Sequence, residues 1–187
     1  MAPNVTTGGI PFSPVPVMIM YDAAGNLVSA ADHNVTITAL GGVSVSGGVA
    51  ATGAIGEVSF PLLAINPSGT YTLRAATPSC DPSCGGTGAV VTVGVGPAVV
   101  IEWSAGSNPI AATGGMTISP PLSLDALDAG GNKVGAGSTT IELRAVGPGT
   151  LSGVTSAFPL TQGASFVFDS LVLDTAGNYS IEASVLV

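Results

Sequence analysis

The chain has 187 residues, of which only 7% are charged, against roughly 25% in ordinary soluble domains. Eleven acidic residues outnumber three basic ones, and the net charge of −8 excludes nucleic acid and anionic membrane surfaces as partners, since no basic patch can form. The 27 glycines and 14 prolines predict short elements joined by many turns.

Apolar residues alternate with a period of two nearly everywhere, which predicts β-strands and excludes amphipathic helices. The first predicted strand, residues 15–21, ends in the turn motif Asp-x-x-Gly-Asn at residues 22–26. The same motif returns at residues 128–132, a shift of 106, after a strand at residues 121–127. Aligning the two copies assigns to the core Pro16, Met18, Met20, Leu122, Leu124 and Ala126.

Other landmarks recur at nearly the same distance. Thr7-Gly-Gly and the strand at residues 35–39 return at the same shift, and Phe60 and Tyr71 return at a slightly larger one as Phe168 and Tyr179. Such self-similarity indicates a tandem of one small module. We expect domain 1 at residues 1–96 and domain 2 at residues 97–187.

Short strands separated by closely spaced turn signals favour a β-sandwich over βαβ units. Val58 with Phe60, and Phe166 with Phe168, should supply most of the aromatic core. Tyr71 and Tyr179 each follow a turn glycine and precede a core position by two residues, the spacing of a tyrosine corner. Each hydroxyl is expected to bond a backbone group upstream.

The succession of these motifs resembles the bacterial immunoglobulin-like (Big-type) repeats of secreted and cell-surface proteins. The motifs are Asp-Ala-x-Gly-Asn after an alternating strand, Val-Thr-Ile or Ile-Glu-Leu, Gly-Thr-Leu-Ser-Gly at 149–153, and Gly-x-Tyr-x-Ile. The resemblance covers nearly the whole chain and implies two tandem immunoglobulin-like β-sandwiches in a bacterial spacer, stalk or adhesin. It carries over no catalytic residues.

Cys80 and Cys84 lie in a predicted loop, and we expect a disulfide that pins it, in an oxidising compartment. A zinc site would need two more soft ligands, and His33 is the only histidine. No nucleophile motif accompanies His33, so the sequence predicts no enzyme and no cofactor.

Three aspartates, Asp22, Asp128 and Asp174, each precede a Gly-Asn pair and could offer oxygen ligands to calcium. The dense alternating acids of a dedicated calcium loop are absent, and Asp and Asn form such turns without an ion. We therefore interpret them as turn residues and predict no metal.

The uncharged, valine-rich stretch at residues 85–101 is interrupted by glycines and a proline. A membrane helix needs about 20 mostly apolar residues, so two consecutive strands are expected here and no membrane insertion. Trp103, at the end of the second of these strands, could stack on a sugar or pack at the junction between the modules.

The two modules are incomplete in opposite ways. A strand at residues 97–104 precedes the Thr-Gly-Gly landmark of the second module, but only residues 1–6 precede it in the first. A strand at residues 89–95 follows the tyrosine strand of the first module and has no counterpart in the second. We expect domain 1 to lack its first strand and domain 2 its last, either because neighbouring modules of a longer array supply them or because a strand from another subunit does.

The outward row of the first strand is expected to be Val15, Val17, Ile19 and Tyr21, whereas the second copy has Ser123 and Asp125 in that row. A strand that is apolar on both faces is usually covered on both. This row is therefore the candidate assembly face, and the expected partners are other copies or neighbouring modules.

The sequence thus predicts a structural or adhesive module of an extracellular or cell-surface protein, stalk or filament. The alternatives are a carbohydrate- or receptor-binding module and a virion decoration or tail domain. A binding module would be expected to group exposed aromatic residues or paired carboxylates on the loops at one end, and this sequence shows neither.

Overall fold

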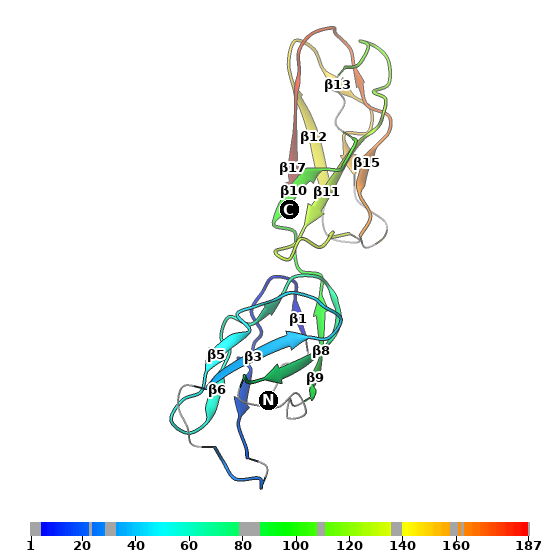
Figure 1. The fold of residues 1–187 in the computed structure, drawn as a ribbon. Helices are drawn as coiled ribbons and strands as arrows, with labels where there is room; N and C mark the ends of the chain where they lie inside the picture. The colour runs from blue at the N-terminus through cyan, green and yellow to red at the C-terminus, as the bar shows by residue number, and fades with distance from the viewer. Residues whose placement is uncertain are drawn as a thin grey trace. The chain divides into compact units, whose positions relative to one another are not determined.

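The computed structural model describes residues 5–22, 24–28, 33–78, 87–107, 111–135, 140–157, 161 and 163–186. Within these ranges the chain is all-β and has no helix, as the alternating pattern predicts (Figure 1). The chain divides into two compact units. Unit 1 comprises Met1–Gly96 with Ala129–Asn132, and unit 2 comprises Pro97–Asp128 with Lys133–Val187.

The described residues of unit 1 form nine strands. They are β1 (Val5–Thr7), β2 (Val17–Ile19), β3 (Asn34–Ala39), β4 (Val45–Ser46), β5 (Val49–Ala51), β6 (Glu57–Ser59), β7 (Ala64–Ile65), β8 (Gly69–Ala76) and β9 (Thr87–Gly94). The main sheet has the order β1-β9-β8-β3-β5, and the pairs β2-β6 and β4-β7 form two further ladders. In the main sheet β8 lies between β3 and β9 (Figure 1).

Unit 2, over the part that the structure describes, has eight strands. They are β10 (Val100–Trp103), β11 (Leu122–Leu127), β12 (Thr140–Val146), β13 (Leu151–Ser152), β14 (Ser156–Ala157), β15 (Phe166–Phe168), β16 (Val172–Leu173) and β17 (Ser180–Leu186). They form sheets of order β10-β11-β15 and β14-β12-β17 and the pair β13-β16.

Each unit has its own apolar core between its ladders, in keeping with a β-sandwich. In unit 1 the main sheet contributes Val35, Ile37 and Val91, which meet Val58 and Phe60 from the β6 side. The expected aromatic residues are all buried, because Phe60, Phe166 and Phe168 are each 1% exposed. Phe12 belongs to the core of unit 1, and its counterpart Ile118 belongs to the core of unit 2, although neither residue lies in a strand.

The repeat holds in the backbone hydrogen bonds as well as in the sequence. The amide of Phe12 donates to the carbonyl of Leu63 over 2.9 Å, and the amide of Ile118 donates to that of Leu171 over 2.8 Å. Likewise β2 pairs antiparallel with β6, and its counterpart β11 pairs antiparallel with β15. The residues that recur are therefore those that build the fold.

Candidate assembly surfaces

The outward row of β2 and its flanks is apolar and exposed. Antiparallel pairing with β6 directs Met18 and Val58 to the core, and alternation turns the neighbours of Met18 the other way. We call Val15, Val17, Ile19 and Tyr21 the β2 face. These four side chains are exposed by 42%, 36%, 50% and 59%. Leu27, bridged to Tyr21 across the turn, is also exposed.

The counterpart of this surface in unit 2 is a polar cluster. In the register of the repeat, Ser123 and Asp125 occupy the positions of Val17 and Ile19. Asp125 was expected to face solvent, but it is only 6% exposed. Its carboxylate receives the ammonium group of Lys133 at 2.8 Å and the hydroxyl of Ser165 at 2.6 Å. The expected exposure was wrong because these two side chains cover the Asp125 carboxylate.

The pKa of Asp125 lies below its ordinary value. Burial alone raises that pKa, because it penalises the charged form. Hydrogen bonds from Lys133, Ser165 and Ser104, together with the positive charge of Lys133, outweigh burial and lower the pKa. Asp125 is therefore an ionised carboxylate stabilised by its partners.

The two copies also differ at one strand edge. In unit 2, β10 pairs antiparallel with β11, and Ile101 stands opposite Ala126. In unit 1, β2 pairs with β6 alone, and the described part of the chain places no strand on its other edge. An unpaired edge presents free N–H and C=O groups that can pair with an added strand.

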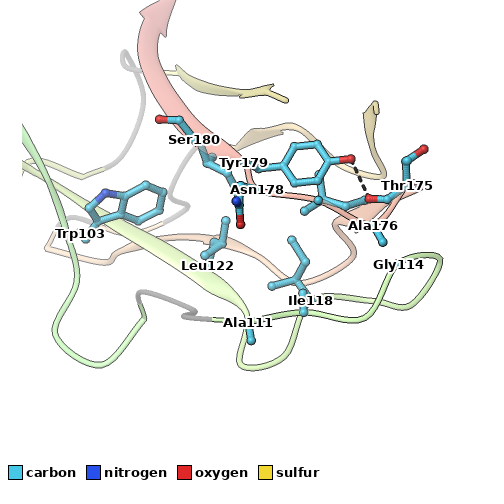
Figure 2. A pocket seen from close by; sticks show the side chains of 14 residues that line it. Trp103, Ala111, Gly114, Ile118, Leu122, Thr175, Ala176, Asn178, Tyr179 and Ser180 are labelled. Carbon is cyan, nitrogen blue, oxygen red and sulfur yellow. Dashed lines mark hydrogen bonds between the residues drawn. The ribbon is translucent and has the colours of Figure 1, made fainter. Parts of the chain in front are cut away.

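Unit 2 also contains a pocket of about 570 Å³ beside β17. Trp103, Ile118, Leu122 and Tyr179 surround it (Figure 2). Trp103, which the sequence placed at the junction of the modules, packs against the core of unit 2 and lines this pocket.

The two tyrosines bond backbone carbonyls upstream. The hydroxyl of Tyr71 donates to the carbonyl of Pro67 over 2.9 Å, and that of Tyr179 donates to the carbonyl of Thr175 over 2.7 Å (Figure 2). The Tyr179 ring also passes close to Gly147, where a Cβ would lie 2.3 Å from a ring carbon. Each tyrosine thus ties the start of its strand to the preceding turn.

The Asp-Gly-Asn segments play different parts. Asp22 accepts from the amides of Ala24 and Asn26, and Gly25 has a φ of 83° that favours glycine. The side chain of Asn26 donates to Asp22 and, with these amides, lowers the pKa of that carboxyl. Asp22 therefore closes its own turn.

Asp174 instead reaches a distant segment. It accepts from the amide and hydroxyl of Thr150, and these bonds lower its pKa. Asp128 is buried. In the described part of the chain no three His, Cys, Asp or Glu side chains form a group that could hold a metal ion.

Three further residues were singled out by the sequence. Cys80 and Cys84 lie outside the described residues, so their disulfide stays a prediction. His33 is partly buried. Its backbone amide donates to the hydroxyl of Thr52 over 3.1 Å, and its carbonyl accepts from the amide of Thr52 over 3.0 Å.

The partners of Asp125 in the polar cluster were not predicted from the sequence. In the register of the repeat, Lys133 is the counterpart of Leu27, and Ser165 is the counterpart of Glu57. Carrying that register past the turn and onto β15 would have placed both beside Asp125. The pocket left no local signal, because its lining comes from separate stretches of unit 2.

Among the described residues, no helix is long and apolar enough to cross a membrane. Comparison of the chain with family models, with curated proteins and with solved structures gave no match.

Proposed function

We propose that the chain is a non-enzymatic structural or adhesive module of an extracellular or cell-surface protein, stalk or filament. In this proposal both units are immunoglobulin-like sandwiches of the bacterial tandem type. They contact other copies or neighbouring modules and use no cofactor. The observation that carries the proposal is the contrast between two copies of one architecture: the fold-building residues recur, and the outer surface over β2 does not.

The contrast has a direct physical meaning. Unit 2 buries Asp125 of its outer row in an ion pair with Lys133, whereas unit 1 presents Val17, Ile19 and Tyr21 to solvent. Contiguous exposed apolar side chains favour association, because burying them releases about 25 cal/mol for each Å² removed from water. The β2 face is therefore the surface through which copies or modules would meet.

The test replaces Val17 and Ile19 by serine in the same chain. We expect the wild-type chain to elute as an oligomer in size-exclusion chromatography and the double variant to elute as a monomer. Because both side chains point away from the core, far-UV circular dichroism should be unchanged. The matched control carries Val90→Ser and Val167→Ser, which alter two exposed valines outside the β2 face. If the β2 variant elutes like the wild type, the β2 face does not mediate association.

A further inference from the structure

The pocket of unit 2 occupies the position that β9 fills in unit 1. In unit 1, β8 is flanked by β3 and β9, and β9 is flanked in turn by β1. In unit 2, β17 has β12 on one edge, and on its other edge the described residues place no strand. Residues 111–113 are the counterparts of β1, and Ala111 and Ala112 line the pocket together with residues of the segment leading into β17.

The register of unit 1 can be transferred to this pocket. On β8, Tyr71 is paired with Val91 and Gly69 with Val93. On β1, Thr6 is paired with Val93. The counterparts of Tyr71, Gly69 and Thr6 are Tyr179, Gly177 and Ala112, and all three line the pocket. A strand in the register of β9 would therefore run along the pocket between its two walls.

Burial shows which surface such a strand would cover. Val91 and Val93 are 0% and 2% exposed and complete the core of unit 1. In that core Ile65 and Leu73 are buried. Their counterparts Leu173 and Ile181 are only partly buried and line the pocket. The apolar surface that β9 helps to cover in unit 1 is accessible in unit 2.

We propose that this pocket binds an added β-strand that carries β-branched apolar side chains at alternate positions, the chemistry of β9. Main-chain hydrogen bonds to the edge of β17 would give affinity, and the two inward side chains would give selectivity. The inference deepens the proposed assembly role and rests on it for its biological meaning. Strand binding itself involves unit 2 alone.

The test uses the full chain and a synthetic peptide with the sequence of residues 87–96. We expect the peptide to change the NMR signals of Ala112, Leu173 and Tyr179. Amide exchange along β17 should slow by about tenfold or more, since the new ladder protects it. A peptide with Val91→Asp and Val93→Asp should not bind, because both changed side chains point inward. A peptide with Val90→Ser and Thr92→Ser should bind like the original, because these side chains point outward in β9.

A tethered strand tests the same site without depending on peptide affinity. The chain is extended at its C-terminus by a flexible linker and a second copy of residues 87–96. The thermal unfolding midpoint of unit 2 should rise by about 5 °C or more, and the tethered strand with both inward aspartates should leave it unchanged. Equal effects of both tethered strands, or no effect of either, would overturn the proposal. The β2 variants lie in unit 1 and are tested by size-exclusion chromatography. Failure of the assembly role can therefore be distinguished from failure of strand binding to unit 2.

Discussion

At the scale of single residues, the two units place different side chains at equivalent positions of their outer faces. The outer face beside the turn motif holds Asp125, Lys133 and Ser165 in unit 2, but Ile19, Leu27 and Glu57 in unit 1. The set of unit 2 buries a carboxylate under its partners, whereas the set of unit 1 leaves two large aliphatic side chains, Ile19 and Leu27, about half exposed. The fold accommodates either set of side chains, so these outer positions can differ between the units without changing the architecture.

Removing the ammonium group should therefore weaken unit 2. Lys133→Leu leaves the buried carboxylate of Asp125 with hydroxyl partners only, and we expect the free energy of unfolding at pH 7 to fall by about 1–3 kcal/mol. Urea denaturation of the full chain measures this. The double variant Asp125→Ile with Lys133→Leu copies unit 1 and should recover most of the loss. A double variant as unstable as the single one would contradict this account.

The same ion pair should leave a signature in the pH dependence. The folded-state pKa of Asp125 is lowered, so its contribution to stability is fully present above the unfolded pKa of about 3.9 and is lost as the pH falls through the folded value. In Lys133→Leu, protonation instead relieves an unpaired buried charge. The stability difference between wild type and variant should thus be largest near neutral pH and should shrink below about pH 4. Denaturation curves at a series of pH values check this.

At the scale of strands, β9 shows how alternation is used. Val91 is fully buried, and the adjacent Val90 is 58% exposed. We expect Val91→Ala to lower the free energy of unfolding of unit 1 by about 2 kcal/mol through the cavity that it leaves. Val90→Ala is the matched control and should change it by about 0.5 kcal/mol or less. Similar losses for both variants would mean that the strand is not packed as described.

Alternation and turn chemistry were sufficient to predict the strands that carry the core. The rows assigned inward include Leu122, Leu124 and Ala126, and all three are buried. Because side chains alternate between the two faces of a strand, the sequence shows which residues share a face. The second copy, aligned in register, then shows which of the two faces is inside. For that reason the all-β class and the aromatic core followed from the sequence, although Met18 and Met20 of the inward row are only partly buried.

What covers an outer face could not be predicted in the same way. Asp125 lies on the outward row as expected, yet it is buried. Lys133, which follows the turn, and Ser165, the residue before β15, cover it. Phe12 lies outside any strand, so no periodicity identified it as core. Both cases depend on contacts between segments, which a local pattern does not contain.

At the scale of the whole molecule, charge and apolar surface oppose each other. Each molecule carries a net charge of −8, so molecules that associated through the β2 face, as proposed, would also repel one another. Raising the ionic strength from about 0.01 M to about 0.5 M shortens the screening length from about 30 Å to a few ångströms. We expect self-association to strengthen over this range, as analytical ultracentrifugation would show. Weaker association at high salt would indicate that ion pairs, and not the β2 face, hold the copies together.

The parallel pairing of β1 with β9 has a mechanical consequence. β1 lies near the start of unit 1 and β9 near its end, and three residue pairs join them from Val5 with Thr92 to Thr7 with Gly94. A force that pulls the two ends of the unit apart acts on these strands in opposite directions along their length. The hydrogen bonds between them are then loaded in shear and share the force, whereas a hairpin pulled open would break its bonds one at a time. Under tension, unit 1 is held where its first and last strands meet.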